Sequence, residues 1–352
     1  MNSEMQSSLI QLADYDYALP PESIAQTPAQ PRDSARLLVL TRDTGCHEHA
    51  QVRDLPRFLR AGDLLVVNAT RVLPARLRGR KATGGAVEAL LLDAAPDAAG
   101  RYRALLRTNG RLRPGLKFRC ESAEATLDAE LLEVLTGGEV LLSFAGAASP
   151  FSLGETPLPP YIRRPCAEVC DELHYQTIFA REAGSVAAPT AGLHFTHALL
   201  EELRRAGIAC VEVVLHVGYG TFKPLRDEDL ARGRLHSEPF WLPPACAEAV
   251  HRTRACGGRV VAVGTTTARV LESCAEANGR VRAGHGTTDL FLRPGSCFRA
   301  VDALLTNFHL PRSSLLLLAA AFAGREFLLA AYRAAIERDY RFYSYGDAML
   351  IV

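Results

Sequence analysis

The chain has 352 residues, of which 48% are hydrophobic and 22% charged, and its formal net charge is +1 at pH 7. This composition excludes an intrinsically disordered chain, which would combine few apolar residues with a large net charge. A chain of this length exceeds one hydrophobic core, so about two domains are expected.

The nine cysteines are scattered and include no C-x-x-C pair, so no disulfide framework is predicted. The amino-terminal segment lacks the apolar stretch of a signal peptide. The longest apolar run, Leu315–Ala323, is much shorter than a membrane span. We therefore expect a cytoplasmic protein without membrane contact.

The first part of the chain predicts two buried strands, Arg36–Leu40 and Asp63–Val67. After Arg71 the apolar stretches become short and alternating, and paired Gly-Gly and Pro-Gly residues interrupt them. Short strands separated by glycine turns are typical of a small β barrel or sandwich. The predicted insert covers residues 72–155, between a first part, 1–71, and a second part, 156–352, of one main domain.

The second part alternates helices and strands, which predicts a layered α/β domain. A helix over Leu199–Ala206 precedes a strand over Ala209–Leu215. The strand Arg259–Val263 leads into a helix over Ala268–Ala277, and the strand Ala303–Thr306 precedes an Ala/Leu-rich helix. In open α/β sheets the loops at the carboxyl ends of strands bind ligands.

Four histidines lie in short segments rich in Gly, Pro, Ser or Thr: His194, His216, His236 and His309. A histidine titrates near neutral pH, so one held in a loop on a rigid scaffold can transfer protons. For any one of them alone, a hydrogen-bonded structural role is the alternative.

Gly264, Thr265 and Thr266 join a predicted strand to a predicted helix. The free N–H groups and the dipole of a helix start can bind a carboxylate or phosphate. The alternative is ordinary capping by Thr266 or Thr267, which such a junction needs in any case.

Between Arg71 and Arg119 the chain has twelve basic and three acidic residues, a local excess of nine positive charges. Such an asymmetry indicates a polyanionic partner such as nucleic acid. A solvated arginine-rich face is the alternative.

Conspicuous motifs follow one another along almost the whole chain: Asp14–Pro20, Arg32–Leu37, Asn68, Thr70–Val72, Pro74–Leu77, Tyr175–Thr177, Ala187–Phe195, His216–Phe222, His236–Glu238, Gly264–Arg269, Thr288–Asp289, Asn307–Ser313 and Phe342–Met349. In this order they resemble the S-adenosylmethionine:tRNA ribosyltransferase-isomerase family of queuosine biosynthesis. Ala69 departs from the pattern, because many relatives carry an amide or acid there, and the insert matches only loosely.

The resemblance implies an α/β main domain with an inserted β-barrel domain. It implies transfer and isomerisation of the ribosyl part of S-adenosylmethionine onto the aminomethyl group of preQ1 in the wobble position of a tRNA with a GUN anticodon. The products are epoxyqueuosine-tRNA, adenine and methionine. It further implies a monomer without a resident metal or prosthetic group.

The chemistry of the family needs a base, an acid for the departing adenine, and an anchor for the amino-acid tail. Matched to the motifs, His194, His216 and His309 are candidates for proton transfer. Glu238 or Asp289 would pair with the sulfonium or the amine, and Thr265, Thr266 and Arg269 would hold the methionine carboxylate. The remaining candidates for substrate binding are Thr190, Gly192, Gly218, Gly220, Thr221, Gly264 and Asn307.

Five basic residues fall where the resemblance puts the junction with the insert, and they are expected to contact tRNA phosphates: Arg71, Arg76, Arg78, Arg80 and Lys81. Two other functions stay open. A metal-dependent hydrolase would use the histidines, although the chain has no H-x-H or H-E-x-x-H spacing. A non-catalytic tRNA-binding protein would account for the basic stretch alone.

Overall fold

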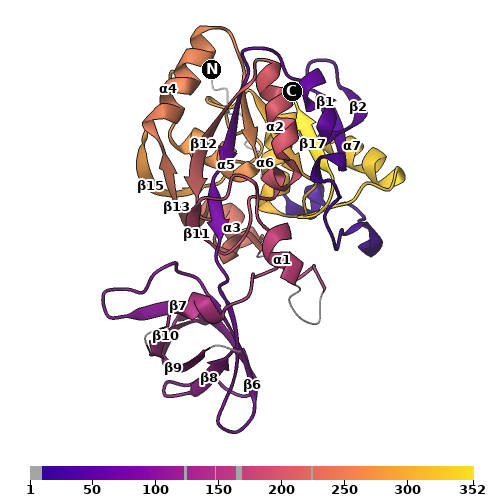
Figure 1. Cartoon of the computed structure of the whole chain (residues 1–352). Coiled ribbons are helices and arrows are strands. Elements are labelled where there is room, and N and C mark those ends of the chain that lie inside the picture. The colour runs from indigo at the N-terminus through magenta and orange to yellow at the C-terminus, as the bar shows by residue number, and fades with distance from the viewer. Residues whose placement is uncertain (1–9, 123–124, 147, 164–168, 223–224) are drawn as a thin grey trace, which may run out of the picture. The chain divides into compact units, whose positions relative to one another are not determined.

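The computed structural model describes residues 10–122, 125–146, 148–163, 169–222 and 225–352, with the backbone alone at residues 169, 221 and 222. The chain divides into two compact units (Figure 1). Unit 1 consists of Met1–Asn68, Thr190–Val214 and Phe222–Val352, and unit 2 of Ala69–Pro189 and Leu215–Thr221. The chain therefore passes from one unit to the other four times.

Within the described residues, unit 1 is built on a nine-stranded sheet in the order β15-β13-β12-β3-β14-β16-β17-β1-β2. Its strands are β1 (Arg36–Thr41), β2 (Cys46–Gln51), β3 (Leu64–Asn68), β12 (Ala209–Leu215), β13 (Arg234–Leu242), β14 (Val260–Val263), β15 (Gly284–Leu290), β16 (Ala303–Asn307) and β17 (Ala348–Ile351). β3 pairs in parallel with β12 and β14, and β14 with β16. β3, β14 and β16 are buried along their whole length, as parallel strands covered on both faces must be.

The helices of unit 1 are α2 (His197–Arg205), α3 (Asp227–Arg232), α4 (Pro244–Ala255), α5 (Thr265–Ser273), α6 (Ser314–Ala323) and α7 (Arg325–Glu337). Its 3-10 helices are η1 (Leu12–Tyr15), η2 (Pro21–Ser23), η3 (Arg32–Ser34), η4 (Val52–Arg57) and η7 (Thr190–His194). α4 contacts β3 and β14, and α5 contacts β3 and the strands from β13 to β16. The layered α/β architecture predicted from the sequence is therefore confirmed. Among the described residues, no single helix is long and apolar enough to cross a membrane; α6 and α7 meet that criterion only as a pair, bent by 112°.

The helix boundaries differ from the prediction by a few residues: α2 is His197–Arg205 instead of Leu199–Ala206, and α5 ends at Ser273 instead of Ala277. The start of α5 is the boundary that matters for the site. α5 begins at Thr265, three residues before the expected start, and Gly264 rather than Thr266 or Thr267 is its N-cap. The hydroxyl of Thr267 instead donates to the carbonyl of Val263, at 2.8 Å, inside the first turn. Capping by a threonine side chain therefore does not account for the threonines at this junction.

Unit 2 contains a closed barrel in the strand order β10-β7-β6-β5-β8-β9 (Figure 1). The barrel strands are β5 (Arg76–Arg80), β6 (Ala86–Leu91), β7 (Arg101–Thr108), β8 (Lys117–Glu121), β9 (Thr126–Val134) and β10 (Glu139–Ala145), with η5 (Thr136–Gly138) and η6 (Pro150–Leu153) beside them. Alternate residues point inward and form one apolar core that includes Leu77, Ala89, Phe118 and Leu142.

Unit 2 is wider than the insert predicted at residues 72–155. β4 (Thr70–Val72) pairs in parallel with β11 (Glu182–Ser185). The Gln176 side chain also accepts a hydrogen bond from the Val72 N–H, at 3.0 Å, and donates one to its carbonyl, at 2.8 Å. These contacts attach the segment after residue 155, which includes α1 (Val169–His174), to the unit that contains the barrel. η8 (Tyr219–Phe222) follows β12.

Candidate active site

Polar residues stand at the carboxyl ends of three neighbouring strands of unit 1. β14 is parallel to β3 on one side and to β16 on the other. The strands end at or lead into Asn68, Gly264 and Asn307, so these residues lie along one edge of the sheet. In α/β sheets this edge is where ligands bind.

Helix α5 starts at this edge after a glycine. Gly264 has φ of 92°, which disfavours every residue with a Cβ, and its N–H donates to the Leu305 carbonyl at 2.8 Å. The first N–H groups of a helix have no acceptor within the helix, and its dipole is positive there. The main-chain amides of Thr265 and Thr266 therefore form a candidate site for a carboxylate or phosphate.

Two buried amide side chains hold the groups around this helix start. Asn68 and Asn307 are each 2% exposed. Asn68 Nδ2 donates to Thr266 Oγ1 at 3.4 Å. Asn307 accepts from the Thr190 hydroxyl at 2.9 Å and donates to the Tyr343 carbonyl at 3.0 Å. These bonds fix the polar side chains of the edge before any ligand binds.

His194 lies in η7 and is buried. Its Nδ1 is 3.1 Å from the Ala191 carbonyl and its Nε2 is 2.9 Å from the Gly346 carbonyl. A neutral imidazole carries one N–H and can donate to only one of them. Burial lowers the pKa of His194, while the two carbonyls act in the opposite direction. The ring therefore ties η7 to the carboxyl-terminal segment.

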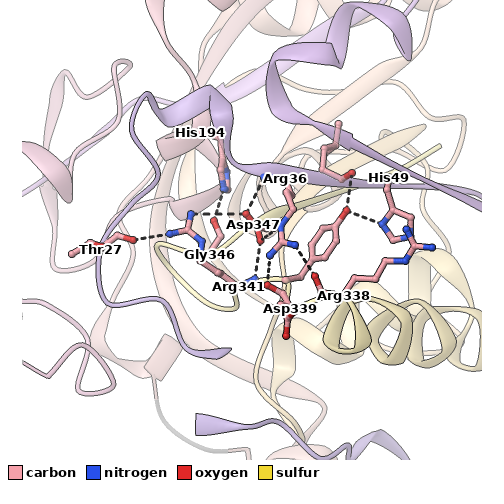
Figure 2. A network of polar contacts seen from close by, with 11 residues as sticks. Thr27, Arg36, His49, His194, Arg338, Asp339, Arg341, Gly346 and Asp347 are labelled. Carbon is pink, nitrogen blue, oxygen red and sulfur yellow. Dashed lines mark hydrogen bonds and ion pairs between the residues drawn. The ribbon is translucent and has the colours of Figure 1, made fainter. Parts of the chain in front are cut away.

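Asp347 fixes that same segment, as Figure 2 shows. Its carboxylate is 1% exposed and accepts from the main-chain N–H of Arg36, at 2.9 Å, and of Arg341, at 2.7 Å. Arg36 Nε lies 3.2 Å from the same carboxylate. Because Asp347 directly follows Gly346, these bonds also fix the Gly346 carbonyl that faces His194.

His309 is enclosed as well. Its Nε2 is 2.8 Å from the Thr306 hydroxyl, and its main-chain N–H donates to the Tyr332 hydroxyl at 2.9 Å. The Tyr17 hydroxyl donates to its carbonyl. Burial lowers the pKa of His309 to about 3. It is therefore neutral at physiological pH.

His216, in unit 2, is half-buried. Its Nδ1 is 2.8 Å from the Thr70 hydroxyl. Gly184 supports the ring so closely that a Cβ there would be 2.6 Å from Cε1 of the imidazole. Burial lowers the pKa of His216, and Glu182 opposes that shift. Of the three histidines predicted for proton transfer, His216 is the one that is half-buried; His194 and His309 are buried.

Glu238 and Arg269 form a buried ion pair within unit 1, with each side chain 5% exposed. Arg269 also donates to the carbonyls of Leu290, at 3.0 Å, and Thr288, at 3.2 Å. The guanidinium predicted to hold a substrate carboxylate is thus engaged with protein groups. Asp289 is partly exposed and lies 3.3 Å from Arg234.

The other predicted residues have simpler surroundings. Gly192 is buried in η7, whereas Gly218 and Gly220 are half-buried in the segment after β12. His236 is exposed on β13. The side chain of Thr221 lies outside the described residues.

Away from the start of α5, the structure has a cavity of about 580 Å³ at the carboxyl end of this helix, lined in part by Phe240, Ser273, Arg282 and His285. Among the described residues, no group of three or more His, Cys, Asp or Glu side chains is arranged to hold a metal ion.

Residues 12–351 match the sequence model of a family described as queuosine biosynthesis protein. The chain belongs to this family. S-adenosylmethionine:tRNA ribosyltransferase-isomerase from Pelobacter propionicus is 51% identical over 343 residues, which are 96% of this chain and 98% of the relative. The enzyme of the same name from Moorella thermoacetica is 48% identical over 349 residues, 97% of this chain and 100% of the relative.

A solved structure, S-adenosylmethionine tRNA ribosyltransferase from Thermotoga maritima, is 39% identical. The match covers 96% of this chain and 100% of the chain in that structure, with a TM-score of 0.55. The family recognised from the motifs is therefore confirmed.

The five basic residues predicted to contact tRNA differ in their surroundings. Arg71 and Arg80 are exposed, and Arg78 lies 3.3 Å from the Glu155 carboxylate. Three of the five donate to carbonyls of unit 2: Arg76 to Leu158 at 2.8 Å, Arg80 to Gly84 at 3.2 Å and Lys81 to Asn109 at 2.8 Å.

The excess of positive charge between Arg71 and Arg119 does not make the barrel basic as a whole. Residues 121–155 contain seven acidic residues and no Lys or Arg. Antiparallel pairing brings these acids beside the basic strands. The resulting ion pairs include Arg103–Glu139 at 3.6 Å, Lys117–Glu130 at 3.4 Å and Arg119–Asp128 at 2.7 Å.

Two contributors to the site of this family member were not singled out from the sequence. In the sequence Asn68 is one residue of a motif, and its place at the end of a predicted strand is the signal that points to it. The Tyr343 carbonyl, which accepts from Asn307, is a main-chain group, and no side-chain pattern reveals it.

Proposed function

We propose that the chain is an S-adenosylmethionine:tRNA ribosyltransferase-isomerase. It transfers the ribosyl moiety of S-adenosylmethionine to the aminomethyl group of preQ1 in the wobble position of tRNA and isomerises it to the epoxycyclopentane of epoxyqueuosine. Adenine and methionine leave. Relatives of that name, 48–51% identical over 96–97% of this chain, support the proposal.

The polar edge at the start of α5 is the structural observation that carries the proposal. S-adenosylmethionine has an amino-acid tail with a carboxylate, and the N–H groups of Thr265 and Thr266 suit that group. Asn68, Thr190 and Asn307 hold hydroxyl and amide groups beside them. A preorganised set of donors of this kind anchors a substrate without reorganisation during the reaction.

The reaction demands proton transfers: a base removes the proton beside the sulfonium, and adenine needs a proton as it departs. We assign proton transfer to His216, because its lowered pKa leaves a neutral imidazole that can accept a proton. We assign positioning roles to His194, His309, Glu238 and Arg269, whose side chains are buried and bonded to protein groups.

The decisive test is incubation of the purified protein with S-adenosylmethionine and tRNA containing preQ1, followed by mass spectrometry of the nucleosides. We expect epoxyqueuosine together with equimolar free adenine and methionine. Bound tRNA without any of these products would contradict the enzyme and favour a non-catalytic tRNA-binding protein.

We further propose that the enzyme acts as a cytoplasmic monomer on tRNAs with a GUN anticodon, without a resident metal or prosthetic group. Product formation should therefore continue after exhaustive dialysis against a chelator. A tRNA carrying preQ1 in another anticodon should be a poor substrate. Loss of activity that added zinc restores would contradict the absence of a metal.

A further inference from the structure

Within the described residues, basic side chains that form no ion pair lie together at one end of the barrel. β5 pairs with β6 and β6 with β7, so that Arg80 lies opposite Ala86, and Val87 opposite Thr108. The end of β5, the start of β6 and the end of β7 therefore meet at one end of the barrel. The end of β9, with Glu133, and the start of β10, with Glu139, lie at this end as well. The start of β5, where Arg76 bridges to Glu155, is at the other end.

Two of the chain segments at this end of the barrel are hydrogen-bonded to each other. The Lys81 ammonium donates to the Asn109 carbonyl at 2.8 Å, and the Thr108 hydroxyl donates to the Ala86 carbonyl at 3.0 Å. Residues 80–86 and 107–116 thus lie side by side. We call these two segments the Arg107 rim.

The Arg107 rim contains five basic residues and no Asp or Glu: Arg80, Lys81, Arg107, Arg111 and Arg113. The last three side chains are exposed. Within the part of the chain that the structure describes, none of the five forms an ion pair, whereas Arg101, Arg103, Lys117 and Arg119 of the same barrel each do. Glu88 lies opposite Arg107 in the strand register and is half-buried.

The chemistry of the rim fits a chain of phosphates. Guanidinium groups bind phosphate oxygens through two parallel hydrogen bonds. The rim has no aromatic residue on which a base could stack. At Gly84 and Gly110 the space that a Cβ would occupy is open, so a ribose-phosphate backbone can approach the main chain closely.

We propose that the Arg107 rim docks the phosphate backbone of tRNA and does so without reading its bases. The inference rests on the proposed function for the nature of the substrate. It moves the principal RNA contacts from the neighbourhood of Arg71, Arg76 and Arg78 to the Arg107 rim, where three exposed arginines follow one another within seven residues. Contacts of this type position a nucleic acid and carry no sequence information.

The test compares two triple variants that remove equal charge. The rim variant is Arg107→Ala, Arg111→Ala and Arg113→Ala, and the control is Arg101→Ala, Arg103→Ala and Arg119→Ala. Affinity for two unmodified tRNA transcripts, one with a GUN anticodon and one without, is measured by filter binding over a range of salt. Circular dichroism and thermal unfolding verify that both variants are folded.

We expect the rim variant to lose at least about tenfold in affinity for both transcripts, and its salt slope to fall by about two to three units, close to one unit for each lost contact. The control should lose much less. In turnover assays the loss should appear in KM for tRNA rather than in kcat. Equal losses in the two variants, or a loss confined to one transcript, would overturn the proposal.

The outcomes separate this inference from the proposed function. If the wild-type chain makes epoxyqueuosine but the rim variant binds tRNA as the control does, the docking surface is wrong and the enzyme stands. If the wild-type chain releases no adenine while the rim variant still loses tRNA affinity, the enzyme is wrong and the docking surface stands.

Discussion

In unit 1 the polar residues around the start of α5 are buried and bonded to one another, whereas in unit 2 the charged residues of the barrel stand on its outer surface. Asn307 and Glu238 are 2% and 4% exposed, but Arg107, Arg111 and Arg113 are all exposed. Buried polar groups are expensive to leave unpaired, and exposed charges are screened by water and salt. Unit 1 is thus suited to fixed positioning of a small molecule, and the Arg107 rim to adaptable contact with a polyanion.

The largest expected effect on activity concerns His216, a candidate for proton transfer that belongs to unit 2. Replacement by Asn preserves a polar group beside Thr70 but removes the titrating imidazole. We expect kcat for adenine release to fall by about 10²–10⁴, the usual contribution of a general acid or base. Thr70→Val, which removes only the hydroxyl partner, should cost less. Near wild-type turnover of the Asn variant would remove His216 from the chemistry.

The buried ion pair gives the largest expected effect on stability. Glu238→Ala leaves the Arg269 guanidinium buried without its carboxylate, and we expect a loss of about 3–5 kcal/mol in the free energy of unfolding. The same substitution at the partly exposed Glu130 of the barrel should cost about 0–1 kcal/mol. Denaturant titration of both variants measures the difference. If the two variants unfold at the same denaturant concentration, burial does not make the Glu238–Arg269 pair more important for stability than the Lys117–Glu130 pair.

A smaller effect is expected when Asn307 at the carboxyl edge of the sheet is replaced by Ala. The substitution leaves the Thr190 hydroxyl without its acceptor and removes one of the hydrogen bonds to the Tyr343 carbonyl, which still accepts from the Gly346 N–H. This should cost about 1–3 kcal/mol in the free energy of unfolding and weaken binding of S-adenosylmethionine. Asn109→Ala on the Arg107 rim should change stability by about 0.5 kcal/mol or less. Calorimetric titration and thermal unfolding test both effects. Unchanged binding in Asn307→Ala would show that the edge does not contact the ligand.

The smallest effect concerns pH. The pKa of His309 is lowered to about 3 in the folded chain, and an unfolded histidine titrates near 6.5. Below that value the unfolded state binds a proton that the folded state does not, so stability falls as the pH falls from 6.5 towards 3. Protonation of this histidine in the unfolded state should lower the free energy of unfolding by about 1 kcal/mol between pH 7 and 5.5. His309→Asn should show a flatter dependence over that interval, and an unchanged slope would contradict it.

Local pattern was enough to predict the elements that carry the sheet edge. The strand predicted at Arg259–Val263 exists as β14, and Gly264 was correctly placed between that strand and a helix. The surroundings of His194 and Arg269 could not be predicted in this way. They depend on partners far along the chain, Gly346 and Glu238, which only the folded structure brings close.

Charge was the harder quantity to predict. The basic excess ending at Arg119 was counted correctly, but the acids from Glu121 to Glu155 pair with much of it across antiparallel strands. A count along the chain ignores strand pairing, and therefore did not separate Arg103 and Arg119 from Arg107.

A crystal structure with S-adenosylmethionine would test the proposed site most directly. We predict that the methionine carboxylate lies against the main-chain N–H groups of Thr265 and Thr266, within hydrogen-bond distance, near the side chains of Asn68 and Asn307. A ligand bound instead at the other end of α5, in the cavity lined by Phe240 and His285, would contradict the placement of the active site at the carboxyl edge of the sheet.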